Sequence, residues 1–261
     1  MQDLIDFATE LAQASGRLIL EHYQRALAGG LEVMHKPDAS PVTVADREAE
    51  TLMRGMIERR HPDHQVLGEE GGISGAADSA RQWVLDPIDG TKSFMHGVPL
   101  FGTLIALLEE GLPVLGAIHL VATGELMIGA KGHPTRVNGR PVRVRSTERL
   151  EDATFAFTDS AQLHRLGLSE GFLALQRRVR IARGWGDCYG HFLVAAGRAD
   201  LMVDPELNVW DVAALKPCVE GAGGRLTEIT GEDPPLGRSA LSSNGRLHAE
   251  ALAVLNAKQR K

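Results

Sequence analysis

Residues 83–91 read Trp83-Val84-Leu85-Asp86-Pro87-Ile88-Asp89-Gly90-Thr91. The apolar start is typical of a buried strand, and Pro87 predicts a turn directly after Asp86. Asp89 then returns to the same side, so two carboxylates are presented together. Like charges this close are unfavourable without a cation, and oxygen ligands with no accompanying His or Cys favour a hard ion such as Mg²⁺. The backbone N–H groups of Gly90 and Thr91, with the Thr91 hydroxyl, are candidates to bind phosphate oxygens.

Two further acidic clusters stand where predicted elements end. One is Gly68-Glu69-Glu70-Gly71-Gly72 and the other is Trp210-Asp211. Taken alone, an Asp-x-x-Asp-Gly stretch is usually just a capped turn. A catalytic interpretation therefore requires the three clusters to belong together.

The composition is that of an acidic globular protein. The 261 residues include 28 Lys and Arg against 34 Asp and Glu, a net charge of −6, and 43% are hydrophobic. This balance argues against nucleic acid or an anionic membrane surface as a partner. The longest apolar stretch, residues 98–108, is well short of the roughly 18 residues that suggest a membrane span. Cys188 and Cys218 lack disulfide or zinc spacing, and acidic residues stand where a secretory signal would be basic, so we expect a cytoplasmic protein.

Hydrophobic periodicity predicts a mixture of helices and strands without an internal repeat. We expect one helix that Thr43 caps and His61-Pro62 ends, and further helices over residues 4–20, 168–177, 189–196, 210–220 and 247–255. The expected strands are residues 65–67, 83–85, 104–108, 114–120, 126–128, 153–157, 199–203, 226–229 and 240–243. Because strict βαβ alternation is lacking, stacked layers are favoured over a barrel.

Turn signals divide the chain. The Val137-Asn138-Gly139 sequence favours a tight hairpin, and after it the expected strands alternate with helices. We therefore predict an N-terminal α+β lobe over residues 1–140, which carries most of the acidic candidates, and a C-terminal α/β lobe over residues 141–261, which carries Asp211 and the substrate pocket. The Gly, Ala and Ser residues of 71–80 indicate a loop.

Several spaced motifs run across nearly the whole chain. They are residues 36–46, Glu69-Glu70, residues 86–91, and Trp210-Asp211-Val212-Ala213-Ala214 followed by Glu220-Gly221-Ala222-Gly223-Gly224. In this order they resemble the inositol monophosphatase-like family of Mg²⁺-dependent phosphatases. The resemblance implies an α/β fold, the layered α-β-α-β-α sandwich of the inositol monophosphatase and fructose-1,6-bisphosphatase type. It also implies a homodimer, with metal ions between the two lobes of each subunit.

The resemblance implies two or three Mg²⁺ ions per subunit. Glu69, Asp86 and the carbonyl of Ile88 match the ligands of a first ion. Asp86, Asp89 and Asp211 match those of a second, on the opposite side of the phosphate. This division is what in-line displacement requires, because the attacking and leaving oxygens lie on opposite sides of phosphorus.

Two further residues, Asp46 and Thr91, take supporting roles in the same resemblance, and Glu69 takes a second role. Asp46 matches a residue that supports a third, more weakly held ion through water. Glu69 and Thr91 would orient and deprotonate the attacking water. The structural alternatives are a helix N-cap for Thr91 and a first-turn interaction for Asp46. Lys36 is interpreted as a solvated loop charge.

The substrate pocket is expected near residues 183–190, which read Arg183-Gly184-Trp185-Gly186-Asp187-Cys188-Tyr189-Gly190. This run and the later Asp204 resemble the histidinol-phosphatase branch of the family, whereas inositol phosphatases have small uncharged residues after the glycine. Histidinol carries an ammonium group and an imidazole, so Asp187 and Asp204 would form a charge-matched pocket. As alternatives, Asp187 caps a helix and Asp204 pairs with an arginine. Arg183 either neutralises phosphate or braces Asp187 across the dimer.

We therefore predict a Mg²⁺-dependent phosphomonoesterase that hydrolyses L-histidinol phosphate to L-histidinol and phosphate, a step of histidine biosynthesis. The substrate-binding candidates are Gly90, Thr91, Arg183, Asp187 and Asp204. An inositol-1-monophosphatase of broad specificity and a non-catalytic, partner-binding member of the fold remain alternatives. The histidines, His96 and His191 among them, lack metal spacing and are expected on the surface or as satisfied core residues.

Overall fold

The computed structural model describes residues 1–29, 33–35, 41–233 and 237–257. Lys36 lies outside these residues. The helices are α1 (Gln2–Leu27), α2 (Val44–Arg60), α3 (Thr91–Met95), α4 (Ser160–Arg165), α5 (Ser169–Arg178), α6 (Asp187–Ala195), α7 (Val209–Val212), α8 (Leu215–Gly221) and α9 (His248–Leu255), with a 3₁₀ turn at Leu150–Asp152.

The strands form two large sheets and one small one. The eight-stranded sheet has the order β10 (Arg140–Pro141), β9 (His133–Val137), β8 (Glu125–Ala130), β7 (Leu112–Leu120), β6 (Gly102–Glu109), β5 (Arg81–Asp89), β3 (Gln65–Gly68) and β4 (Gly72–Gly75). The five-stranded sheet has the order β12 (Ile181–Arg183), β11 (Thr154–Phe157), β13 (Leu201–Asp204), β15 (Ala240–Ser243) and β14 (Arg225–Thr227). The small sheet pairs β1 (Val33–His35) with β2 (Pro41–Thr43).

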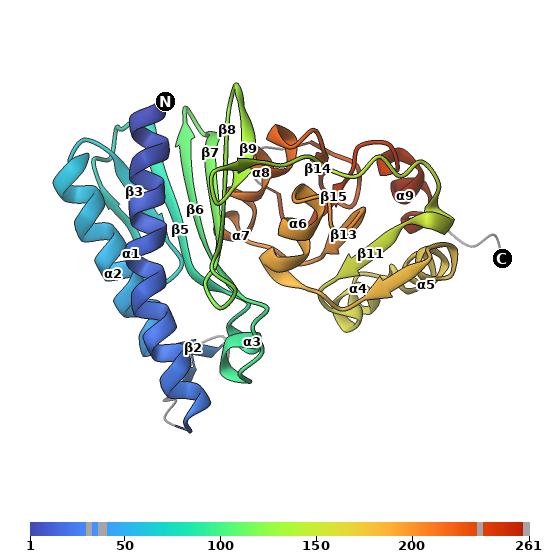
Figure 1. The fold of residues 1–261 in the computed structure, drawn as a ribbon, viewed down its shortest axis with the longest axis horizontal. Coiled ribbons are helices and arrows are strands. Elements are labelled where there is room, and N and C mark those ends of the chain that lie inside the picture. Colours follow the sequence, from blue (N-terminus) through green and yellow to red (C-terminus); the bar gives the residue numbers. More distant parts are fainter. Residues whose placement is uncertain (30–32, 36–40, 234–236, 258–261) are drawn as a thin grey trace.

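The elements stack in five layers, as Figure 1 shows. Helices α1 and α2 cover the outer face of the eight-stranded sheet, and α6, α7 and α8 lie between the two large sheets. Helices α4, α5 and α9 cover the far face of the five-stranded sheet. This is the predicted α-β-α-β-α sandwich, and that prediction is confirmed. The boundary at residues 140 and 141 stays a prediction.

The central strand β5 is buried on both faces, which explains its continuous apolar run. Trp83 and Leu85 pack under α1 and α2, while Val84 points to the opposite face and belongs to the core between the sheet and the central helices. This alternation follows from the two-residue period of a strand. The end of β5 therefore lies between an outer helical layer and the central one.

Two glycines bring the central helices against the sheet at backbone distance. A Cβ atom at Gly116 of β7 would lie 2.1 Å from the carbonyl oxygen of Ala214. One at Gly129 of β8 would lie 2.5 Å from the Cα of Cys218 in α8. Any larger residue would push α8 off the sheet. The close packing fixes the preceding helix α7, which carries Asp211, over the same sheet.

Most of the predicted elements are present, with shifted ends. The first helix extends to Leu27, and Thr43 caps α2 through a capping box with Asp46. The Asn138-Gly139 pair joins β9 to β10 with φ of 47° and 77°, as a tight hairpin turn requires. The helix predicted over residues 210–220 is instead two helices, α7 and α8.

The expectation of a plain loop at residues 71–80 is wrong in part. Residues 72–75 form β4, which pairs antiparallel with β3 at the edge of the sheet. All of its residues are exposed, so no alternation of apolar and polar side chains marked it in the sequence. Among the described residues, no helix combines the length and the apolar character needed to cross a membrane.

Candidate metal and phosphate site

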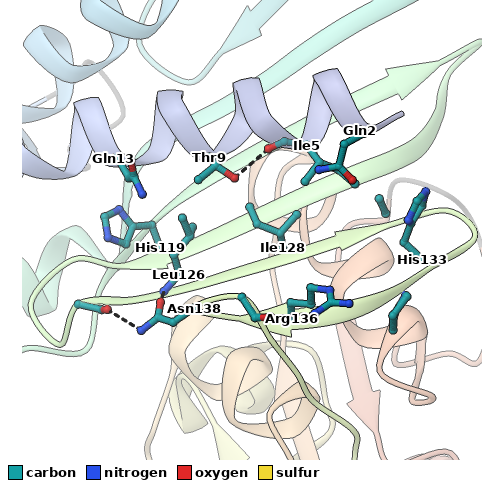
Figure 2. A pocket seen from close by; sticks show the side chains of 14 residues that line it. Gln2, Ile5, Thr9, Gln13, His119, Leu126, Ile128, His133, Arg136 and Asn138 are labelled. Atoms are coloured by element: carbon teal, nitrogen blue, oxygen red, sulfur yellow. Dashed lines mark hydrogen bonds between the residues drawn. The ribbon is translucent and has the colours of Figure 1, made fainter.

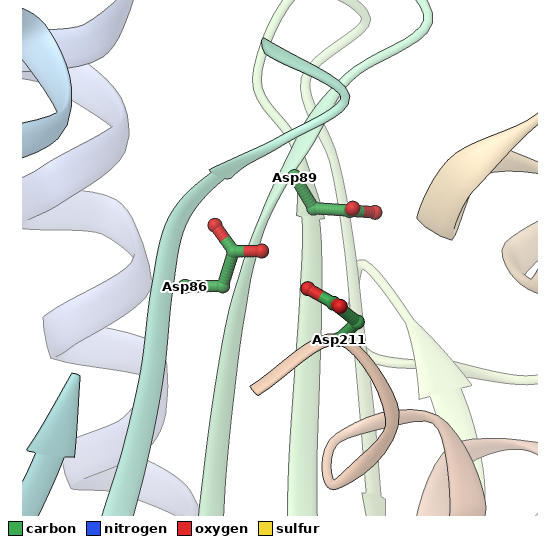
Figure 3. Close-up of side chains that lie close together, drawn as sticks. All are labelled: Asp86, Asp89 and Asp211. Atoms are coloured by element: carbon green, nitrogen blue, oxygen red, sulfur yellow. The ribbon is translucent and has the colours of Figure 1, made fainter. Parts of the chain in front are cut away.

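Three aspartates converge between the eight-stranded sheet and the central helices. Asp86 and Asp89 come from the end of β5, and Asp211 comes from α7. One carboxylate oxygen from each lies within 4.8 Å of those of the other two. Figure 3 shows the three side chains around one common space. Two elements far apart in the chain thus supply one cluster of oxygen donors.

Asp86 and Asp89 point to the same side of β5 because the strand contains an irregularity between them. In a regular strand, residues three positions apart point to opposite faces. Here Asp86 pairs with Leu104 and Asp89 with Gly102, so β5 holds one residue more than β6 between these pairs. Such a bulge turns Asp89 toward the same side as Asp86. The strand therefore continues through Asp89, and the predicted turn at Pro87 is a bulge.

Backbone N–H groups bind two carboxylates of the cluster, and a side-chain hydroxyl binds the backbone of the bulge. The hydroxyl of Thr103 donates to the carbonyl of Pro87 at 2.8 Å, across the bulge. The N–H of Asn208 donates to Asp211 Oδ2 at 2.6 Å, as part of a capping box at the start of α7. The N–H of Cys188 donates to Asp89 Oδ2. Asp89 and Asp211 are thus each bound at one oxygen.

Burial and mutual repulsion raise the pKa values of these carboxyls. Burial is the main cause for Asp86, followed by the charges of Glu69, Asp89 and Asp211, and its pKa is well above the usual range. Burial also raises the pKa of Asp89 well above its usual range and that of Asp211 to about 7. Asp86 Oδ1 is buried without a hydrogen-bond partner. An unpartnered oxygen within an all-carboxylate cluster fits a hard divalent cation such as Mg²⁺.

This charge cluster predicts that stabilisation by Mg²⁺ depends on pH. A carboxyl whose pKa is raised on folding takes up protons, so apoprotein stability falls as pH rises from about 4 to about 7. Bound Mg²⁺ removes that penalty. In differential scanning fluorimetry, we expect saturating Mg²⁺ to raise Tm by about 5 °C or more at pH 8, and by much less at pH 5.5. NaCl at equal ionic strength serves as the control, and an equal Mg²⁺ shift at both pH values would contradict the prediction.

Glu69 lies beside this cluster at the end of β3. Its N–H donates to the carbonyl of Leu85 at 3.1 Å, which places it next to the strand that carries Asp86. The charge of Glu69 acts on both Asp86 and Asp211. The structure therefore brings Glu69 together with the three aspartates.

Glu50 braces the Glu69-Glu70 loop and was missed in the sequence. Its carboxylate is buried and accepts the N–H groups of Glu70 and Gly71, each at 2.8 Å. Arg54 Nε donates to it at 2.7 Å. Gly68 leaves room for this contact, because a Cβ there would lie 2.4 Å from the Glu50 carboxyl carbon. The available signal was an acidic residue within the apolar face of α2.

The brace predicts that Glu50→Gln destabilises the protein. The amide keeps one acceptor oxygen and turns a donor toward the loop N–H groups, so buried donors lose their partner. We expect the free energy of unfolding in urea to fall by about 2 kcal/mol. Glu58→Gln is the matched control, because Glu58 is exposed on the same helix, and we expect it to change stability by less than about 0.5 kcal/mol. Equal effects of the two substitutions would refute the bracing role.

The residues that follow Asp89 form a tight turn into α3. Thr91 Oγ1 donates to the carbonyl of Ile88 at 3.0 Å. Gly90 has φ of 84°, and a Cβ there would lie 2.9 Å from the carbonyl oxygen of Leu100 and 3.2 Å from Asp187 Oδ2. Only glycine combines this backbone conformation with this approach. The turn therefore brings the phosphate-binding candidates beside Asp187.

Asp187 and Asp204 extend the acidic cluster toward the five-stranded sheet. Asp187 begins α6, and its N–H donates to Thr158 Oγ1 at 3.0 Å. Burial, followed by the charge of Asp204, raises the pKa of Asp187 to about 7, while Lys92 opposes the rise. Asp204 ends β13 and is 4% exposed. Its charge also acts on the pKa values of Asp89 and Asp211.

Two other sequence candidates make hydrogen bonds to neighbours in the chain. Arg183 is exposed in β12, where Nη1 donates to the carbonyl of its neighbour Ala182 at 2.8 Å. Asp46 accepts hydrogen bonds from the N–H and hydroxyl of Thr43, so the helix-cap role is observed. Burial raises the pKa of Asp46 to about 6, to which the charges of Glu70 and Glu69 contribute. Its metal role stays a prediction.

A cavity of about 670 Å³ lies elsewhere, between α1 and strands β7 to β9, as Figure 2 shows. Gln13 and Ile5 of α1 face His119 and Ile128 across it. No carboxylate lines this cavity, so it does not offer the oxygen donors of the aspartate cluster. This cavity is therefore not part of the acidic site.

The family model described as the inositol monophosphatase family matches residues 1–260. The chain belongs to the inositol monophosphatase family. It is therefore a phosphatase of a Mg²⁺-dependent family, with phosphate esters as the implied class of substrate.

Individual members of the inositol monophosphatase family are similar over nearly the whole chain. A histidinol-phosphatase from Chlorobaculum parvum is 39% identical over 252 residues, 96% of each chain. A histidinol-phosphatase from Mycobacterium tuberculosis is 43% identical over 232 residues, 87% of this chain and 89% of that protein. The structure of an inositol monophosphatase from Zymomonas mobilis matches with a TM-score of 0.86 and 35% identity, over 98% of both chains.

Proposed function

We propose that this protein hydrolyses L-histidinol phosphate to L-histidinol and phosphate. The observation that carries the proposal is a pair of further carboxylates, the half-buried Asp187 and the buried Asp204, beside the metal-binding candidates. A neutral polyol gives these two residues no counter-charge, whereas the ammonium group of histidinol does. The similarity to two histidinol-phosphatases supports the same substrate.

Five groups would hold two ions in the working enzyme. They are the carboxylates of Glu69, Asp86, Asp89 and Asp211 and the carbonyl of Ile88. Asp46 would support a third ion through water. When bound, Mg²⁺ supplies Lewis acidity and offsets negative charge on the phosphate and the leaving oxygen.

The residues of the protein itself orient the reactants. Glu69 and Thr91 would hold the attacking water, with Glu69 accepting its proton. The N–H groups of Gly90 and Thr91 would bind phosphate oxygens. Asp187 and Asp204 would hold the ammonium group and so align the ester for in-line attack. Arg183 would reach the site as a phosphate contact or as a brace from a second subunit.

We further propose that the protein is a homodimer of the cytoplasm. The homodimer is the usual state of the family it resembles. The location rests on the cysteines, because Cys188 and Cys218 are both buried free thiols. We also propose that the boundary between the two lobes lies at residues 140 and 141.

The decisive experiment compares kcat/KM for L-histidinol phosphate and inositol-1-phosphate on purified protein with Mg²⁺. We expect kcat/KM for histidinol phosphate to be higher by at least about 100-fold, the effect of one well-paired buried charge. A preference for inositol-1-phosphate would instead assign an inositol-1-monophosphatase of broad specificity. No phosphate release from either ester at any Mg²⁺ concentration would favour the non-catalytic alternative.

A further inference from the structure

His191 is a fully buried histidine with one unpartnered nitrogen. It lies one turn after Asp187 in α6 and is 0% exposed. Its Nδ1 is 2.6 Å from Ser242 Oγ, and its Nε2 is buried without a hydrogen-bond partner. The expectation that this histidine is on the surface or satisfied in the core is therefore wrong. An unpartnered polar atom in the interior is costly, so this nitrogen calls for a role.

The unpartnered nitrogen faces Asp204. His191 Nε2 lies 3.7 Å from Asp204 Oδ2. The charge of Asp204 also acts on the carboxylates of Asp89, Asp187 and Asp211. Within the described part of the chain, His191 is the one basic side chain within 4.0 Å of the Asp204 carboxylate. Asp204 therefore has repulsive neighbours on the site side and an imidazole behind it.

The carboxylate selects the tautomer of His191, because an ionised carboxylate only accepts hydrogen bonds, whereas the Ser242 hydroxyl can donate or accept. When the Ser242 hydroxyl donates to Nδ1, the neutral imidazole carries its proton on Nε2. That proton then lies on the nitrogen that is nearest to Asp204 Oδ2, at 3.7 Å. Ser242 is itself fully buried in β15, so the arrangement is shielded from water. A shielded chain of hydrogen bonds restricts the orientation of its last member.

We propose that His191 is a positioning residue, whose Nε2–H holds the Asp204 carboxylate in the orientation that binds the substrate ammonium group. The inference rests on the proposed function and extends it to a residue that does not touch the substrate. His191 acts through Asp204, so its loss weakens binding of a cationic substrate and leaves the metal-binding carboxylates in place.

The chain offers a matched control in His248. This histidine is 1% exposed, and its Nδ1 lies 2.8 Å from the hydroxyl of Ser243, the next residue of β15. Its Nε2 lies 2.9 Å from Thr227 Oγ1, so both of its nitrogens have partners. His191 and His248 thus share burial and a serine partner, and they differ in contact with Asp204.

The first experiment measures kcat and KM of His191→Leu and His248→Leu on both esters. We expect His191→Leu to raise KM for histidinol phosphate about tenfold, with kcat changed by less than about threefold and KM for inositol-1-phosphate unchanged. His191→Gln, which retains a terminal N–H donor, restores KM to within about threefold of wild type. Equal KM values for the two Leu variants, or equal KM increases on both esters, would overturn the inference.

The second experiment needs no activity and separates failure of the inference from failure of the proposed function. Imidazole ¹⁵N NMR of the full chain reports the tautomer of each histidine. We expect a His191 Nε2–H signal that shifts in Asp204→Asn, while the His248 signals stay in place. If the His191 signal does not shift in Asp204→Asn, the inference is overturned, even if histidinol phosphate is the substrate. If the signal shifts but the wild-type protein does not hydrolyse histidinol phosphate, the contact between His191 and Asp204 is supported and the substrate assignment is overturned.

Discussion

Replacing Asp89 with asparagine is expected to lower kcat by at least about 1,000-fold at saturating Mg²⁺. Asn preserves the size of the side chain and the oxygen that accepts the Cys188 N–H. It removes one negative charge from the three-aspartate cluster, and with it an anionic ligand that Mg²⁺ prefers. The measurement is phosphate release from histidinol phosphate, with Mg²⁺ titrated over several decades of concentration.

The stability of the Asp89→Asn variant provides an independent control. Repulsion from Asp187, Asp211 and Asp204 adds to burial in raising the pKa of Asp89, so the apoprotein gains stability when this charge is removed. We therefore expect a higher Tm than wild type without Mg²⁺ at pH 8, and a smaller rise on adding Mg²⁺. Near-wild-type turnover would contradict the assignment of Asp89 as a metal ligand.

The second large effect is expected at Asp187, where the substitution must respect the backbone. Asp187 has φ of 55°, a left-handed conformation that asparagine tolerates far better than alanine. Asp187→Asn should therefore keep the start of α6 and remove the charge alone. We expect kcat/KM for histidinol phosphate to fall about 100-fold, because a charged partner of the ammonium group is lost. For inositol-1-phosphate we expect a fall of less than about fivefold.

Asp159 offers the matched control for this experiment. It lies close enough for its charge to act on Asp187, and it caps α4 by accepting the N–H of Ala161 at 2.7 Å. Asp159→Asn should leave the ratio of kcat/KM values for the two esters unchanged. If Asp187→Asn lowers kcat/KM equally on both esters, Asp187 does not recognise the ammonium group. Asp187→Ala should lose additional stability through backbone strain.

Much of the fold was predictable because its signals are local. The apolar face of α1 repeats at helical spacing, and five strands of the eight-stranded sheet, β3, β5, β6, β7 and β8, contain short apolar runs. The Asn138-Gly139 turn and the Thr43 cap depend on residues adjacent in the chain, and both are present. Strand β4 was missed because it is exposed on both faces and carries no hydrophobic pattern.

The bracing and positioning residues were not predictable in the same way. Glu50 reads as one more charged residue of an amphipathic helix until the loop after β3 folds onto it. His191 reads as an isolated histidine until β13 and β15 bring Asp204 and Ser242 to it. Both roles depend on contacts between distant segments; the position of Glu50 on the apolar face of α2 indicates burial but does not name the loop that it contacts.

The sequence by itself determined the chemical types present at the site and the order in which they occur. Residues 83–91 contain an apolar strand, two carboxylates and a glycine turn, and this content alone indicates oxygen ligands for a hard cation. Those properties belong to side chains and to their neighbours in the chain. Family membership, which covers residues 1–260, adds phosphate esters as the substrate class.

The tertiary structure placed together the carboxylates that the sequence motifs had grouped, and it alone decided how strongly they repel one another. The bulge in β5 turns Asp86 and Asp89 to one side, and the close packing of α8 on the sheet brings Asp211 to meet them. The pKa values of these carboxyls are raised because the fold buries them and brings their charges close together in space. Separation along the chain carries no information about either.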